Sequence, residues 1–247
     1  MAFERINVVG VPVDLCPPED LERVVLTLLD KPGTKQIVFL SVWDLLNARR
    51  KNIFGECIRS ADLILPVSRS ILWGASFLKK SVPVRYSPFL AVISILTILE
   101  THYKSLYILG GKKKRLLEAE RNIRQTYRNL KIVGRYIGNI PRSKENDVIL
   151  AVNKASPSLV LLCEGVASRI NWAFRRRNKL TSGIYLYYPH AVGVFSKHKK
   201  RISDETFEKG HEIWVEIVRN PFKVLLVFPF LKYILLLLGY RLFKRGQ

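Results

Sequence analysis

The residues best suited to chemistry in this sequence are cations that gather in one stretch. Between Gly165 and Ser203 there is no aspartate or glutamate, while the same stretch carries nine lysines and arginines. These cations are Arg169, Arg175, Arg176, Arg177, Lys179, Lys197, Lys199, Lys200 and Arg201. A solvated face needs fewer cations and tolerates acids, so we expect an anionic partner, either a phosphorylated ligand or an anionic membrane.

A second cationic feature is the segment LGGKKKR at residues 109–115. Gly110 and Gly111 separate a predicted strand from a predicted helix. Free N–H groups and the helix dipole at such a turn favour a phosphate, so both glycines are candidate substrate-binding residues. The complete dinucleotide fingerprint is absent, and a tight turn followed by a solvated basic face explains the same residues.

The histidines and cysteines predict neither a metal site nor disulfides. The four histidines lack metal-ligand spacing, and His190 with Ser196 forms no serine–histidine motif. Cys16, Cys57 and Cys163 lie far apart, as is typical of reduced, buried thiols in a cytosolic protein. We therefore expect no metal and no cofactor.

The composition allows one large α/β domain, or one domain with an appendage. The chain has 247 residues, of which 48% are hydrophobic and 25% charged, and its formal net charge is +21. That charge is compatible with nucleic acid, anionic lipid or a phosphorylated substrate. No nucleic-acid-binding motif is present, so we expect no nucleic-acid partner.

Strands and helices alternate along residues 1–200. Alternation with continuous apolar strands indicates a mostly parallel sheet with helices on both faces, and hence a Rossmann-like α/β domain. Strands are predicted near residues 6–9, 11–13, 36–40, 63–65, 106–109, 131–133, 159–163 and 184–187. Helices are predicted near residues 17–29, 42–60, 71–78, 89–102, 112–127, 146–154 and 167–177.

Residues 61–85 combine a strand, a turn and a helix at the place where ligands bind in such folds. The apolar run 63–65 stops at Pro66, and an amphipathic helix follows the turn. In open α/β sheets, ligands bind just beyond the carboxyl ends of the strands. A plain strand–turn–helix connection is the alternative interpretation.

Residues 201–247 form a predicted C-terminal helical appendage. An amphipathic helix at 204–218 precedes a mostly apolar segment at 224–242. A membrane span takes about 20 residues, but Lys232 lies mid-segment and Pro229 is expected to break the helix. We therefore expect a helix or hairpin lying in the membrane interface, with burial against the α/β domain as the alternative.

Motifs in a fixed order run through nearly the whole chain. They are VVGVPVDL near the N-terminus, then SADLILP, LYILGGKKK, NLKIVGRYIG and finally GHEIWVEIVRNP. Their order and spacing resemble those of the WecG/TagA/CpsF glycosyltransferases. The resemblance implies a Rossmann-like fold and the transfer of an N-acetylmannosamine-type sugar from a UDP-sugar donor. It further implies a polyprenyl-pyrophosphate-linked acceptor in cell-surface polysaccharide synthesis, at the cytoplasmic face of the membrane. A homo-oligomer is possible.

Several positions that should carry the chemistry depart from the family pattern. The family's Pro-Asp-Gly turn, whose Asp is the expected general base, corresponds to Pro66, Val67 and Ser68. Valine cannot accept a proton. The family's Thr-x-Asn corresponds to Phe39 and Ser41. The resemblance places Ser41 and Ser68 among the substrate-binding residues.

Other family positions keep their residue type. Arg85, Gly165, Trp172 and Arg201 match the family pattern, whereas the Gly-Gly-x-Phe-Asp-Phe signature is lost at residues 189–194. The resemblance implies that Trp172 binds substrate. If the chain is an active transferase, we expect Arg85, Arg169 and Arg201 to neutralise the diphosphate as the sugar leaves.

Two hypotheses follow from the missing aspartate. In the first, another carboxylate serves as the base; Glu164, which follows the strand 159–163, is the stronger candidate, and Asp44 in a helix's first turn the weaker. An ion pair to a nearby arginine is the alternative role for Glu164. In the second, the chain is a non-catalytic relative that binds a lipid-linked or nucleotide ligand or a partner enzyme. A carboxylate in the pocket beside Val67 would favour the first hypothesis.

Overall fold

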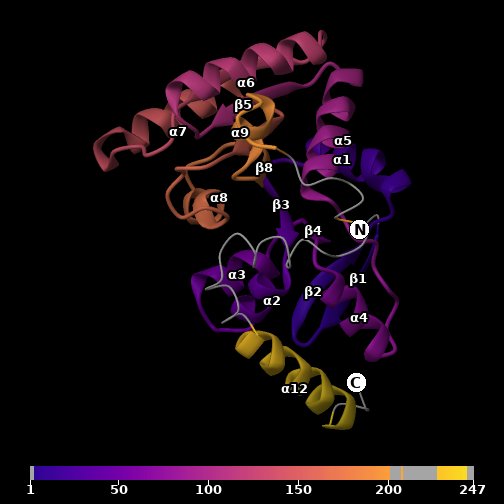
Figure 1. Cartoon of the computed structure of the whole chain (residues 1–247). Helices are drawn as coiled ribbons and strands as arrows, with labels where there is room; N and C mark the ends of the chain where they lie inside the picture. The colour runs from indigo at the N-terminus through magenta and orange to yellow at the C-terminus, as the bar shows by residue number, and fades with distance from the viewer. Residues whose placement is uncertain (1–2, 201–206, 208–226, 244–247) are drawn as a thin grey trace.

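A parallel six-stranded sheet forms the centre of the computed structural model, which describes residues 3–200, 207 and 227–243. The strands are β3 (Thr34–Leu40), β4 (Leu63–Pro66), β5 (Ser105–Leu109), β6 (Lys131–Tyr136), β7 (Leu159–Leu162) and β8 (Gly183–Tyr187). Their order is β4-β3-β8-β7-β5-β6 (Figure 1). The predicted Rossmann-like α/β class is confirmed.

Because all six strands are parallel, their carboxyl ends meet at one edge. Leu40 of β3 pairs with Pro66 of β4, and Leu162 of β7 pairs with Tyr187 of β8. The residues that follow these strands therefore lie side by side, although more than a hundred positions separate some of them in the sequence.

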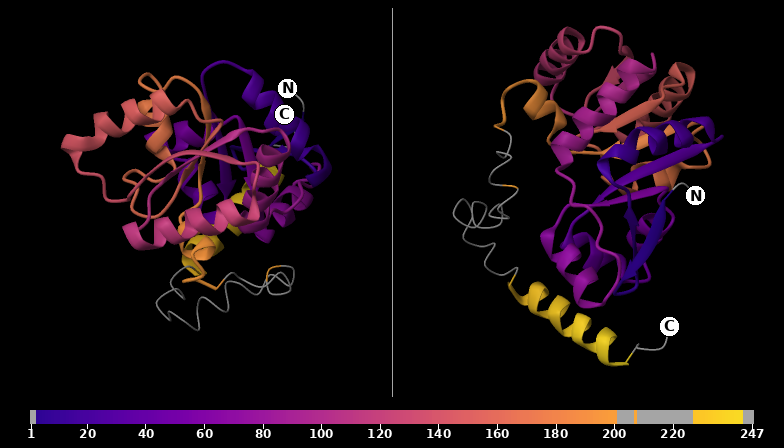
Figure 2. Two further views of the ribbon diagram at one scale, coloured as in Figure 1. Left: turned by 90° about the horizontal axis from the view of Figure 1, so that it is seen from above. Right: turned by 90° about the vertical axis from the view of Figure 1, so that its right-hand side faces the viewer.

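Helices cover both faces of the sheet, as the two views of Figure 2 show. One face packs α1 (Leu21–Asp30), α5 (Pro88–Thr101), α6 (Lys113–Thr126) and α9 (Ala191–Phe195). The other packs α2 (Val42–Ala48), α3 (Ile53–Arg59), α4 (Arg69–Phe77), α7 (Glu145–Ala155) and α8 (Asn171–Arg176). Short 3₁₀ turns, η1 (Pro18–Asp20) and η2 (Arg142–Lys144), precede α1 and α7. Alternate strand residues face opposite ways, so Ile37 joins the first core and Val38 the second.

The first two strands form a separate antiparallel hairpin, β1 (Glu4–Val8) and β2 (Val11–Leu15). A buried carboxylate fastens this hairpin to the sheet. Asp14 accepts a hydrogen bond of 2.6 Å from the Ile64 N–H and one of 2.5 Å from Arg5 Nε. Arg5 in turn donates to the carbonyl oxygen of Ala61.

Two predicted helices differ from the structure. The helix expected over 42–60 is two helices, because Asn52 Oδ1 caps a new start by accepting from the Gly55 N–H (2.8 Å). The carbonyl of Ala48 at the end of α2 is bound by Arg59 Nη1 (2.6 Å). The helix expected over 167–177 starts only at Asn171, because residues 168 and 169 have left-handed φ angles of 63° and 46°.

The C-terminal helix α12 (Val227–Phe243) packs beside α2 and α4 (Figure 1). Tyr233 and Leu237 are buried in the same core as Leu45 and Ile71. The break expected at Pro229 is wrong, because this proline lies in the helix's first turn, where its missing N–H has no partner to lose.

The described helices include none that is long and apolar enough to cross a membrane. The amphipathic helix predicted at 204–218 lies outside the described residues apart from Phe207, and so does Arg201. The domain boundary near residue 200 stays a prediction.

Candidate active site

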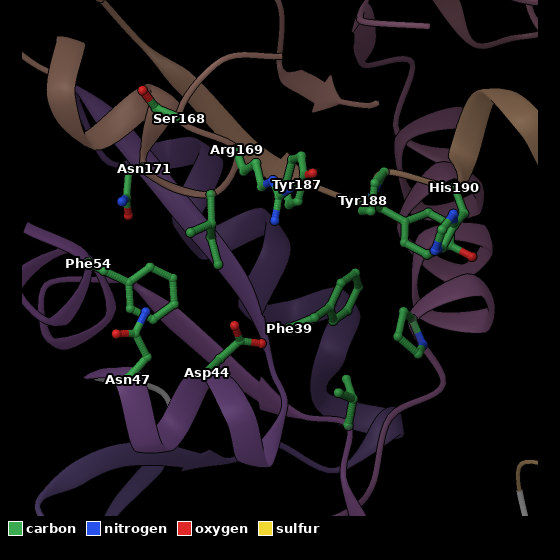
Figure 3. A pocket seen from close by; sticks show the side chains of 14 residues that line it. Phe39, Asp44, Asn47, Phe54, Ser168, Arg169, Asn171, Tyr187, Tyr188 and His190 are labelled. Carbon is green, nitrogen blue, oxygen red and sulfur yellow. The ribbon is translucent and has the colours of Figure 1, made fainter. Parts of the chain in front are cut away.

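A cavity of about 630 Å³ lies beyond the carboxyl ends of β3, β4 and β8, where an α/β sheet binds ligands. Its walls come from distant parts of the chain: Asp44 and Asn47 on α2, Val67 after β4, Arg169 before α8, and Tyr187 at the end of β8 (Figure 3). Its size suits a small molecule of the dimensions of a nucleotide or a sugar.

Among the described residues that line this cavity, Asp44 is the one carboxylate. Ser41 is the N-cap of α2, and it forms a capping box with Asp44. The Ser41 hydroxyl and the Ser41 N–H both donate to Asp44 Oδ2, at 2.6 and 3.2 Å. No described group donates a hydrogen bond to Oδ1, and Figure 3 shows the side chain directed into the cavity.

Burial raises the pKa of Asp44 above its ordinary value, and the hydrogen bonds from Ser41 lower it in part. A carboxylate whose ionised form is poorly solvated binds a proton more readily. Perturbed carboxylates in a cleft are typical of general bases. Asp44 therefore has the position and the proton affinity of a base.

Aromatic side chains form much of the remaining wall. Phe39 and Tyr188 meet edge to face with ring centroids 6.4 Å apart, and Phe54 and Tyr187 line the side near α3 and β8. Burial raises the pKa of Tyr188 to about 12, so its hydroxyl stays protonated at neutral pH. Rings of this kind stack on a nucleobase or on the apolar face of a sugar.

Glu164 lies outside this lining and is held by two cations. Its carboxylate oxygens lie 3.9 Å from Arg115 Nη1 and 3.5 Å from Lys199 Nζ. Lys199 Nζ is also 3.3 Å from Nδ1 of His190, which does line the cavity. Glu164 is thus connected to the cavity only indirectly, through Lys199 and His190. Its ion pairs are the alternative role that the sequence suggested for it.

The chain matches the family model of the WecG/TagA/CpsF glycosyl transferases over residues 6–247. It belongs to this family. No curated protein matches the chain.

Within this WecG/TagA/CpsF chain, Val67 of the replaced turn lines the same cavity as Asp44. The Val67 N–H donates to the Leu40 carbonyl (3.0 Å), and Ser68 Oγ accepts from the Val42 N–H (3.1 Å). The hydroxyls of Ser41 and Ser68 are therefore both engaged at the start of α2. They orient this helix, and through it the Asp44 carboxylate, beside the position where the family's aspartate is expected.

The retained family arginine lies behind this turn. Arg85 donates from Nε to the Val67 carbonyl (2.9 Å) and from Nη1 to the Phe207 carbonyl (2.6 Å), and its guanidinium stacks 3.7 Å from the Phe207 ring centre. Arg169 instead lines the cavity and is exposed. Of the two arginines, only Arg169 lines the cavity.

Three further predicted ligand-binding residues lie in packed surroundings. The N–H groups of Gly110 and Gly111 donate to the carbonyls of Tyr136 (2.8 Å) and Glu164 (2.7 Å), so neither is open to a phosphate. At Gly111, with φ of 81°, a side chain would meet Val192. The Trp172 ring is fully buried and lies 6.2 Å from that of Tyr185.

The sequence interpretation did not single out Asn47, Tyr187 or His190 as cavity residues. One signal for Asn47 was available, because it follows Asp44 by three positions and so shares its helix face. Tyr187 ends β8 and His190 follows it by three residues, and only the order of the strands brings β8 next to β3.

Proposed function

We propose that this chain is an active glycosyltransferase of its family, with Asp44 as general base. The observation that carries the proposal is that a carboxylate with a raised pKa lines the same cavity as Val67. The proposed reaction transfers an N-acetylhexosamine, of the N-acetylmannosamine type, from a UDP-sugar to a polyprenyl-pyrophosphate-linked acceptor in cell-surface polysaccharide synthesis.

In the proposed step, the acceptor hydroxyl attacks the anomeric carbon of the donor sugar. The new glycosidic bond forms as the bond to UDP breaks, and the hydroxyl proton passes to Asp44 Oδ1. Arg169 neutralises the charge that develops on the leaving diphosphate. The aromatic side chains Phe54 and Tyr187 supply stacking surfaces for the nucleobase or the sugar of the donor.

The location proposed for this reaction is the cytoplasmic face of the membrane, with the protein bound peripherally. Support comes from α12, whose outward side carries large apolar residues, and from the formal net charge of +21. Arg85 and Arg201 remain proposed contributors to diphosphate binding, Arg85 by supporting the Val67 turn.

The experiment that tests the base compares Asp44→Asn with Glu164→Gln. Both variants remove one carboxylate while keeping its shape and part of its hydrogen bonding. The assay follows UDP release from UDP-N-acetylmannosamine with a prenyl-diphosphate-linked N-acetylglucosamine acceptor. Asp44→Asn is expected to lower kcat by about 10²–10⁴-fold, and Glu164→Gln to stay within a fewfold of the parent.

Three results would contradict the proposal in different ways. Loss of turnover in Glu164→Gln alone would make Glu164 the base. Equal turnover in both variants and the parent would exclude both carboxylates as the general base. No transfer by the parent with any UDP-sugar, together with measurable ligand binding, would establish the non-catalytic relative.

A further inference from the structure

A smaller cavity, of about 270 Å³, lies at the edge of the sheet opposite to the candidate active site. Lys31 lies three residues before β3 and Asp62 one residue before β4, and both residues line it. We call it the amino-edge cavity. The Asp44 cavity lies at the carboxyl ends of the same strands, and the seven residues of β3 span about 20 Å, so the two cavities are distinct sites.

A guanidinium with a fixed orientation lines the amino-edge cavity. Arg5 donates from Nε and Nη2 to the carboxylate of Asp14, and from Nη2 to the carbonyls of Ala61 (3.0 Å) and Asp62 (3.3 Å). No described residue accepts a hydrogen bond from Nη1 of Arg5. An arginine that is already held in place binds a further acceptor with little additional loss of side-chain freedom.

Two further cations, Lys31 and Arg59, line the cavity and are exposed. No described acidic side chain pairs with Lys31, and Arg59 is bound only through Nη1, which donates to the Ala48 carbonyl (2.6 Å). The charge of Arg5 is balanced by its own ion pair, so these two cations face one carboxylate, that of Asp62, among the described residues of the lining. The excess of positive charge favours an anionic group such as a phosphate.

Other polar side chains of the lining offer acceptors. Thr27 Oγ1 and Ser60 Oγ each donate their proton to a backbone carbonyl of the preceding helical turn, at 2.7 and 3.1 Å. Asp62 Oδ2 accepts from the Gln36 N–H (2.8 Å), and no described group donates to Oδ1. Because these oxygens are left to accept hydrogen bonds, a matching ligand carries donors such as hydroxyl groups besides its anionic group.

The apolar part and the size of the cavity narrow the class of ligand further. Phe3, Val24 and Leu28 line it, and side chains of this kind pack on the apolar face of a sugar ring. Its volume is less than half the 630 Å³ of the Asp44 cavity. It therefore suits a monosaccharide that carries one phosphate rather than a nucleotide sugar.

Hydrogen bonds connect the amino-edge cavity to the candidate active site through one residue of β3. Gln36, whose N–H is bound by Asp62, donates from Nε2 to the Ile170 carbonyl (2.6 Å). Ile170 lines the Asp44 cavity. A ligand that binds Asp62 therefore acts on a residue that also fixes the wall of the active site.

From these features we infer that the amino-edge cavity binds a small sugar phosphate as a regulatory ligand. Arg5, Lys31 and Arg59 contact the phosphate, and the sugar hydroxyls donate to Asp62 and Thr27. The effect of this ligand on turnover rests on the proposed function; the binding itself does not.

The binding test uses the full chain and glucose 1-phosphate as the probe, followed by calorimetry. Lys31→Glu is expected to weaken binding about tenfold or more. Lys154→Glu is the matched control and is expected to bind as the parent does, because Lys154 is also exposed at the C-terminal end of a helix but lies outside the cavity. Thr27→Phe fills the cavity without a change of charge and is expected to abolish binding, while far-UV circular dichroism checks that α1 is retained.

Equal affinity of Lys31→Glu and Lys154→Glu would overturn the inference, and so would the absence of binding by the parent. Equally tight binding of inorganic phosphate would also contradict it, since the sugar would then contribute nothing. Displacement of glucose 1-phosphate by UDP would place the probe in the Asp44 cavity and overturn the inference as well.

Turnover measurements separate this inference from the proposed function. Saturating glucose 1-phosphate is expected to change kcat of the parent by about twofold or more in the UDP-release assay and to leave that of Lys31→Glu unchanged. An unchanged kcat of the parent despite binding would refute the regulatory role and leave the proposed function. Binding of glucose 1-phosphate by a parent that transfers no sugar would refute the proposed function and leave the binding site.

Discussion

Asp44 lines a cavity at the carboxyl edge of the sheet, and burial raises the pKa of its carboxyl group. Glu164 follows a neighbouring strand, yet Arg115 and Lys199 hold it as an ion pair. At the scale of single residues, placement in the cavity therefore favours Asp44 over Glu164. The capping box with Ser41 gives this carboxylate its orientation.

The raised pKa predicts the acidic limb of the pH–rate profile. Protonated Asp44 cannot accept the acceptor's proton, so the rate is expected to fall as pH decreases through its raised pKa. The fall in rate should occur at a pH above the ordinary pKa range of aspartate. It should be absent from the residual activity of Asp44→Asn. UDP release measured between about pH 4 and 8 checks this.

A stability measurement separates this role from a structural one. Because folding raises the pKa of Asp44, its ionised form lowers stability above the folded-state pKa, and the effect vanishes below the unfolded-state pKa. Asp44→Asn is therefore expected to have an equal or higher Tm at pH 7 and an unchanged Tm at low pH. A large decrease in Tm at pH 7 would indicate that Asp44 mainly stabilises α2.

At the scale of elements, α12 is held to the domain by a few specific contacts. The Tyr233 hydroxyl donates to the Ser70 carbonyl (2.9 Å), and Arg241 Nη1 donates to the Phe77 carbonyl (2.9 Å). Gly74 leaves the space that the Tyr233 ring occupies on α4. These contacts hold α12 against α4 and α2, the helix that carries Asp44.

Gly74→Ala is expected to displace α12, because the added methyl group would overlap the Tyr233 hydroxyl. Alanine favours a helix over glycine by about 1 kcal/mol, so α4 itself should remain helical. Hydrogen exchange of the α12 amides is expected to accelerate. Gly239→Ala is the control, since nothing described lies within 4 Å of its added methyl group, and it should leave exchange unchanged or slower. Equal exchange in the two variants would contradict this docking.

At the scale of the whole molecule, positive charge and the apolar outward side of α12 act together. Under the proposed peripheral location, the formal net charge of +21 would attract an anionic surface over a distance that salt shortens, and the exposed apolar side chains of α12 would hold the protein there. This combination favours lipid over nucleic acid, which would leave the exposed leucines of α12 without a role.

Vesicle flotation tests this combination. The parent is expected to float with phosphatidylglycerol-containing vesicles and not with neutral ones. Leu235→Glu/Leu242→Glu is expected to reduce the bound fraction severalfold with no loss of Tm, because both side chains are about 70% exposed. Retention of nucleic acid by the parent at moderate salt, with no flotation, would favour the nucleic-acid alternative.

The sequence by itself determined the parallel α/β class and the family, because both depend on local patterns. Apolar runs such as 159–162 predict buried strands whatever their neighbours, and the order of motifs is a property of the chain alone. It also showed that Val67 cannot serve as a base. The boundaries of α2, α3 and α8 escaped prediction, because side-chain caps and left-handed residues set them.

Only the tertiary structure decided which carboxylate lines the same cavity as Val67. The cavity joins α2, the turn after β4 and the end of β8, which lie up to about 150 positions apart in the sequence. The spacing of residues along the chain does not predict that these segments lie together, because their proximity follows from the order of the strands in the sheet. The packing of Tyr233 against Gly74 likewise places α12 beside α4 through the burial of apolar side chains that lie far apart in the sequence.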